Sequence, residues 1–93
     1  MRDVTKKEMM EYRTMGREMI RRQLEKYPVE SRELQEQVDR NLAKFDHHAG
    51  LMRLSLIKGD LKAHYRGLVT AVRRIRYLSE NQVFLDECLA KES

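Results

Sequence analysis

The feature that most constrains this chain is an apolar stripe between residues 34 and 56, in which successive members lie three or four positions apart. The stripe consists of Leu34, Val38, Leu42, Phe45, Ala49, Met52 and Leu56. Because an α-helix has 3.6 residues per turn, this spacing places the whole stripe on one helix face, where it can pack against another helix. Ser31 is a candidate N-cap before the stripe, and Gly59 after it suits a left-handed C-terminal turn. The stripe therefore predicts a helix over about 32–58.

A second apolar stripe follows Gly59 with the same spacing. Its members are Leu61, Tyr65, Leu68, Val72 and Ile75. If the chain folds back at Gly59, each member falls beside one member of the first stripe, from Leu61 beside Leu56 to Ile75 beside Leu42. This agreement predicts an antiparallel helical hairpin whose second arm covers about 61–78.

Helix signals also precede the hairpin. Thr5 and Glu8 form a capping box at the start of a helix over about 5–27. Pro28 ends this helix, because its ring disfavours helical geometry at the preceding residue and it lacks a backbone donor. Gly16, inside the helix, indicates either the close approach of a neighbouring backbone or a tolerated weakness.

The end of the chain predicts one more helix. After residue 76 the apolar face rotates, which favours a break near Ser79 and a short helix over about 81–90, an unbroken helix being the alternative. The predicted fold class is all-α, with one domain over residues 1–93. It combines the antiparallel helical hairpin with a third, N-terminal helix in a three-helix-bundle-like arrangement and the short C-terminal fourth helix.

Apolar residues outside the two stripes exceed what a hairpin buries. One set lies on the second helix away from its stripe, and most methionines lie on the first helix, where thioethers suit either core filling or a docking surface. The predicted partner or self-association surface consists of Met9, Tyr12, Met19, Leu51, Leu54 and Ile57. A chain this short buries only part of its apolar area alone, so we expect a homodimer or larger homo-oligomer. The first hypothesis is a small protein-protein interaction module that serves as an adaptor, chaperone or regulatory subunit.

Basic residues concentrate on the expected third helix. Residues 49–78 carry seven basic and one acidic side chain, whereas residues 79–93 carry one basic and four acidic. The candidate polyanion-binding residues are Lys62, Arg66, Arg73, Arg74 and Arg76. Such a row can follow phosphates, although few aromatic residues lie near it to stack on bases. The alternative hypothesis is a sequence-tolerant nucleic-acid-binding protein; a solvated face or a subunit contact would explain the same charges.

The histidines do not predict a metal site. His47 and His48 are adjacent in sequence, so they diverge by about 100° on a helix. The hairpin register puts His64 about 10 Å along the axis from His48, which is too far for a shared ion. We therefore expect solvent-facing or interfacial imidazoles, with no metal and no cofactor.

The sequence also lacks the motifs of common enzymes. It has no phosphate-binding glycine loop, dinucleotide fingerprint, helical His-Glu-x-x-His pattern or nucleophile elbow, so we expect neither catalysis nor a small-molecule substrate. No apolar run approaches the roughly 18 residues that span a membrane, and the first residues do not resemble a signal peptide. The single cysteine, Cys88, agrees with a reducing compartment, so the expected location is the cytoplasm.

Overall fold

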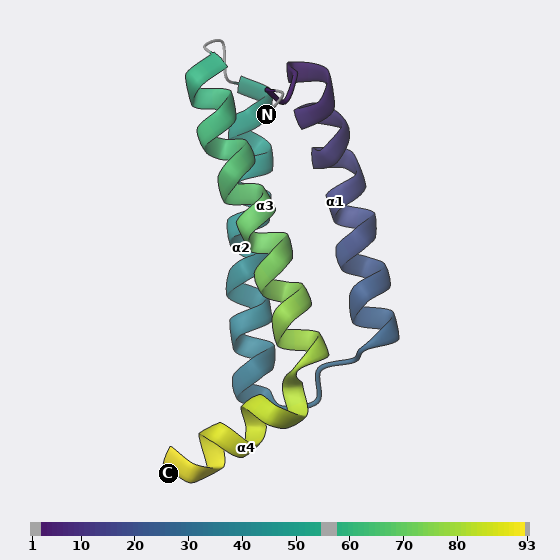
Figure 1. Ribbon diagram of the computed structural model, residues 1–93, viewed down its shortest axis with the longest axis vertical. Helices are drawn as coiled ribbons and strands as arrows, with labels where there is room; N and C mark the ends of the chain where they lie inside the picture. Colours follow the sequence, from purple (N-terminus) through teal and green to yellow (C-terminus); the bar gives the residue numbers. More distant parts are fainter. Residues whose placement is uncertain (1–2, 55–57, 93) are drawn as a thin grey trace.

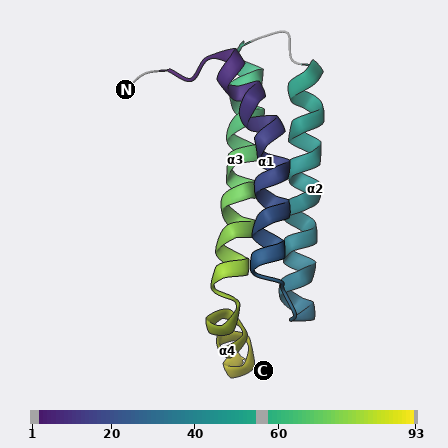
Figure 2. The ribbon, with the colours of Figure 1, turned by 90° about the vertical axis from the view of Figure 1, so that its right-hand side faces the viewer.

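The computed structural model describes residues 3–54 and 58–92, which form four helices and no strand. The helices are α1 (Lys6–Lys26), α2 (Arg32–Leu54), α3 (Lys58–Glu80) and α4 (Gln82–Glu92). The first three run alongside one another, and α4 turns away from the end of this bundle (Figure 1). Seen from the side, α1 lies in front of the α2–α3 pair and runs along it (Figure 2). The predicted all-α fold, with a hairpin, an N-terminal third helix and a short fourth helix, is confirmed.

Local hydrogen bonds begin the first two helices where the sequence predicts. The Thr5 hydroxyl accepts from the Glu8 backbone N–H at 3.1 Å and donates to the Glu8 carboxylate at 3.2 Å. The Ser31 hydroxyl accepts from the Leu34 backbone N–H at 3.4 Å. In each helix the hydroxyl thus accepts from a backbone N–H of the first turn, which has no partner within its own helix.

The connection between α2 and α3 differs from the sequence prediction. Lys58 begins α3, so Gly59 lies in the first turn of that helix and does not close α2. No glycine in the described residues has a positive φ angle, so the predicted left-handed turn at Gly59 is wrong. A glycine in a helix costs only about 1 kcal/mol, which the flanking helix offsets. The predicted end of the second helix, with Leu56 and Ile57, lies outside the described residues.

The core joins the two predicted stripes and receives two residues from α1. Its buried apolar residues are Met9, Ile20, Leu34, Val38, Phe45, Ala49, Met52, Leu61, Leu68, Ala71, Val72, Ile75 and Leu78. The buried faces of α2 and α3 therefore follow the helical spacing of the sequence. Two stripe members in the described residues are only partly buried, Leu42 and Tyr65, and Asn41 is buried beside Leu42.

Polar contacts hold α1 against its own hairpin. Arg13 Nε donates to the backbone oxygen of Ala49 on α2 at 2.7 Å. Farther along, Arg17 Nη2 lies 3.2 Å from Asp46 Oδ1, also on α2. These contacts join the first half of α1 to α2, and the second half of α1 lies beside the C-terminal half of α3.

The last helix is anchored at its first residue. Gln82 Nε2 donates to the backbone oxygen of Pro28 at 3.0 Å, which ties the start of α4 to the α1–α2 connection. Beyond this point Val83 is 73% and Phe84 59% exposed. None of the helices that the structure describes is both long and apolar enough to cross a membrane.

Candidate functional site

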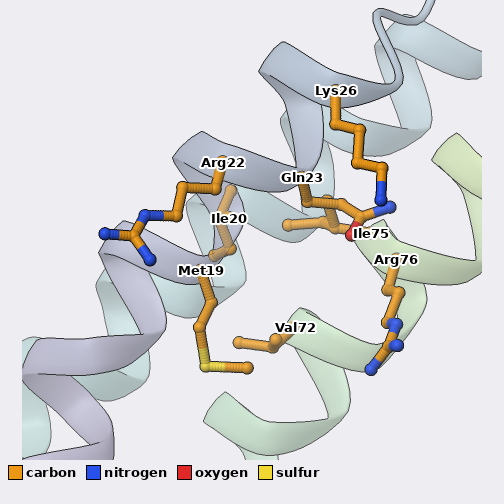
Figure 3. A pocket seen from close by; sticks show the side chains of 8 residues that line it. All are labelled: Met19, Ile20, Arg22, Gln23, Lys26, Val72, Ile75 and Arg76. Carbon is orange, nitrogen blue, oxygen red and sulfur yellow. The ribbon is translucent and has the colours of Figure 1, made fainter.

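A groove lies between the second half of α1 and the C-terminal half of α3 (Figure 3). It is lined by Met19, Ile20, Arg22, Gln23, Lys26, Val72, Ile75 and Arg76. Its volume is about 230 Å³. Pockets that enclose small molecules usually measure about 300–1,000 Å³, so this groove suits one or two side chains of a partner better than a free metabolite.

The floor of the groove is apolar. Ile20, Val72 and Ile75 belong to the buried core, and Met19 remains 38% exposed above them. In Figure 3 the Met19 side chain extends toward Val72 across the gap between the two helices. A flexible thioether at this place can adapt its shape to an inserted side chain.

The rim of the groove is cationic. Arg22, Lys26 and Arg76 border it on both helices, and the guanidinium groups of Arg22 and Arg76 extend outward in Figure 3. Arg22 pairs with Glu18 at 3.1 Å and Arg76 with Glu80 at 3.2 Å, in exposed positions. Because exposed ion pairs are worth only about 0–1 kcal/mol, a carboxylate on a partner can replace the internal one at little cost.

A hydrogen-bond relay fixes one end of the groove. Gln23 Nε2 donates to the Ser79 hydroxyl at 2.8 Å, and that hydroxyl donates to the Arg76 backbone oxygen at 3.0 Å. The relay connects α1 to the last turn of α3. It therefore links the two walls of the groove at this end.

The structure separates the residues predicted for a partner surface. Met9 is a correction to that set: it is 0% exposed and belongs to the core, because α1 packs on its own hairpin. Tyr12 is half-buried and meets Tyr65 edge to face, with ring centroids 5.7 Å apart. Burial and the neighbouring Tyr65 raise the pKa of Tyr12, so its hydroxyl stays neutral. Met9 and Tyr12 therefore pack within the bundle, Met9 in the core and Tyr12 against it.

The other described residues of that predicted surface lie in different places. Met19 lines the α1–α3 groove, whereas Leu51 is half-buried on α2. Leu54, at the end of α2, is 74% exposed. Ile57 lies outside the described residues.

The predicted basic stripe is divided by internal contacts. Lys62 lies 3.3 Å from the Asp3 carboxylate, and Arg76 belongs to the groove rim and pairs with Glu80. The other three members, Arg66, Arg73 and Arg74, are exposed. Among the described residues they form no ion pair, and the last two line a second hollow that also contains Tyr77.

The structure contradicts the predicted separation of His48 and His64. Their Nδ1 atoms lie 3.2 Å apart and form a hydrogen bond between α2 and α3. The predicted separation of about 10 Å was wrong because the His48 ring lies against Gly67, which is three residues, or about 4.5 Å, along α3 from His64. Burial, with His64, His47 and Lys44 nearby, lowers the pKa of His48, which favours the neutral form of its ring.

Comparison with known proteins assigns neither a family nor a function to this chain. No family model, curated protein or solved structure matches this chain. The site therefore rests on geometry, and most of its lining was missed from sequence. The spacing of Met19, Gln23 and Lys26 does place them on one side of a helix, but nothing in that spacing shows that this side faces α3.

Proposed function

We propose that this protein is a helical protein-interaction module that binds an acidic amphipathic helix of another protein in the α1–α3 groove. The observation that carries the proposal is the combination of an apolar floor, with the partly exposed Met19 above it, and a rim of three cationic side chains. Amphipathic helices dock apolar residues into such grooves. Acidic residues flanking those anchors would meet Arg22, Lys26 and Arg76.

A defined peptide pair tests the proposal. One short helical peptide carries leucines at i, i+3, i+4 and i+7 with flanking glutamates, and the other carries lysines in place of the glutamates. We expect the acidic peptide to bind, with an affinity that falls as salt rises, and the basic peptide to bind at least about tenfold more weakly. Fluorescence anisotropy measures both. Equal affinities for the two peptides, or no binding of the acidic one, would contradict the proposal.

Two methionines on α1 supply a matched pair of variants. Met19 lines the groove, whereas Met15, one turn earlier and 58% exposed, does not. Met19→Lys places a fourth cation over the apolar floor and should weaken binding of the acidic peptide by about tenfold, because a desolvated lysine is costly there. Met15→Lys should leave the affinity unchanged. The same loss in both variants would show that binding does not use this groove.

A second candidate function is nucleic-acid binding through Arg66, Arg73 and Arg74, since these exposed side chains form no ion pair among the described residues. Anisotropy of short DNA and RNA duplexes at several salt concentrations tests it. Salt-sensitive binding that Arg66→Glu with Arg73→Glu abolishes would support this function, because counterions leave the phosphates as arginines bind. Binding that survives both changes would exclude the stripe.

A further inference from the structure

Two histidines from different helices meet where α2 packs on α3. The Nδ1 atoms of His48 and His64 lie 3.2 Å apart, their ring centroids are separated by 5.4 Å, and the ring planes are tilted by 42°. Both residues are half-buried. One Nδ1 must carry the hydrogen that the other accepts, so the two rings share one N–H···N bond when both are neutral.

Glycine at position 67 makes room for this arrangement. A Cβ at Gly67 would lie 2.6 Å from both Cδ2 and Cε1 of His48, so the imidazole occupies the space that a side chain would need. Glycine weakens a helix relative to alanine, and Gly67 lies well inside α3. The helix therefore carries a destabilising residue at the place where it admits the His48 ring, one turn from His64.

We propose that His48 and His64 bind a divalent transition-metal ion, such as Zn²⁺ or Cu²⁺, through their Nδ1 atoms and so link α2 to α3. With metal–nitrogen bonds of about 2.0–2.1 Å, two ligands of a tetrahedral ion lie about 3.3 Å apart. The observed Nδ1–Nδ1 separation of 3.2 Å is close to this value. The hydrogen of the shared bond moves from Nδ1 to Nε2 of the same ring, so no net charge is gained or lost.

The two imidazole nitrogens determine which class of metal ion the site prefers. Imidazole nitrogens suit zinc, copper and nickel, whereas Mg²⁺ and Ca²⁺ prefer oxygen ligands. No group of three or more His, Cys, Asp or Glu side chains in the described residues could hold a metal. The ion therefore has two protein ligands and completes its shell with water. Copper should bind more tightly than zinc, as expected for nitrogen ligands.

Calorimetric titration of the untagged, full-length protein with ZnCl₂, CuCl₂ and MgCl₂ tests the proposal. We expect saturable binding of one Zn²⁺ or Cu²⁺ per chain and none of Mg²⁺. His48→Gln and His64→Gln should each weaken zinc binding by at least about tenfold, because each removes one of two ligands. His47→Gln is the matched control and should stay within about twofold, since the His47 ring lies 5.4 Å from that of His48 and is exposed.

A spectroscopic readout separates ligation from a merely structural role. In ¹H–¹⁵N spectra of the imidazoles, Zn²⁺ should shift the Nδ1 signals of His48 and His64 and leave a hydrogen on each Nε2. Circular dichroism of each variant establishes that its helices are intact. Wild-type zinc affinity in folded His48→Gln or His64→Gln, or no saturable binding of either transition metal at millimolar concentration, would overturn the proposal.

Discussion

The ring of Phe45 on α2 lies directly over Gly16 on α1. A Cβ at position 16 would be 2.8 Å from Phe45 Cε2 and 3.1 Å from Cζ, and Phe45 itself is only 1% exposed. The glycine therefore admits a buried aromatic side chain, which is neither a neighbouring backbone nor a tolerated weakness. This contact lets α1 approach the buried Phe45 ring of α2 closely.

Gly16→Ala should destabilise the protein by about 1–3 kcal/mol, because the added methyl overpacks a fixed ring and so outweighs the gain in helix propensity. Urea denaturation measures the change in the free energy of unfolding. Gly50→Ala is the control. Apart from its chain neighbours and the backbone of its own helix, no atom of the described residues lies within 4 Å of the new Cβ, so this variant should gain up to about 1 kcal/mol. A stabilised Gly16→Ala protein would contradict the Phe45 contact.

Asn41 carries a buried oxygen without a hydrogen-bond partner among the described residues. Its Nδ2 donates to the Gln37 backbone oxygen at 2.8 Å, but Oδ1 accepts nothing. Asn41→Leu should stabilise the fold by about 1 kcal/mol, since an apolar side chain of similar size removes an unsatisfied acceptor. Asn41→Asp should destabilise it, because the charge is buried. Thermal unfolding of both variants checks the prediction, and a loss of stability in Asn41→Leu would show that the amide has a favourable role.

Asn41 also marks the limit of what periodicity predicts. The apolar spacing identified the hairpin and most of its buried residues, because Val38, Phe45 and Ala49 must share a face on any helix. Between Val38 and Phe45 the same spacing predicted that Leu42 is buried, but the structure buries Asn41 and leaves Leu42 partly exposed. Which of these two adjacent residues is buried depends on how α2 is rotated about its axis. That rotation is set by packing against the other helices, which the spacing along α2 does not report.

The candidate site depends on still longer-range contacts. The groove forms where the second half of α1 lies against the C-terminal half of α3. The contacts that join α1 to α2, such as the Arg13 bond to the Ala49 oxygen and the Arg17–Asp46 pair, follow no sequence period. The basic stripe could be recognised on α3 alone. That Arg76 borders an apolar groove could not, because the opposite wall comes from a distant part of the chain.

Glu18 should titrate below the ordinary range of a glutamate. Arg21 binds its carboxylate through both Nε and Nη2, and this contact lowers the pKa of Glu18. A carboxyl with a lowered folded-state pKa favours folding above its unfolded pKa of about 4.3, and this contribution is lost as the pH falls below that value. Carboxyl ¹³C titration by NMR measures it, and Arg21→Gln should raise the pKa of Glu18. An unchanged pKa in that variant would contradict the assigned cause.

Leu54 tests the expected self-association. Because its side chain is 74% exposed, Leu54→Asp should leave the free energy of unfolding of the monomer within about 0.5 kcal/mol of the wild type. If the end of α2 forms a subunit contact, the same change should weaken the oligomer, since a charge would enter an apolar interface. Sedimentation at several protein concentrations measures both species. An oligomer of unchanged affinity would exclude Leu54 from the contact.

The measurement that tests the central claim most directly is a two-dimensional ¹H–¹⁵N NMR titration of the labelled protein with the acidic amphipathic peptide. The amides of residues 19–26 on α1 and 72–76 on α3 should shift together, because these segments line the groove. The exposed start of α4, at Val83 and Phe84, should be unaffected. Shifts confined to α4, or to the Arg73 and Tyr77 side of α3, would contradict the account.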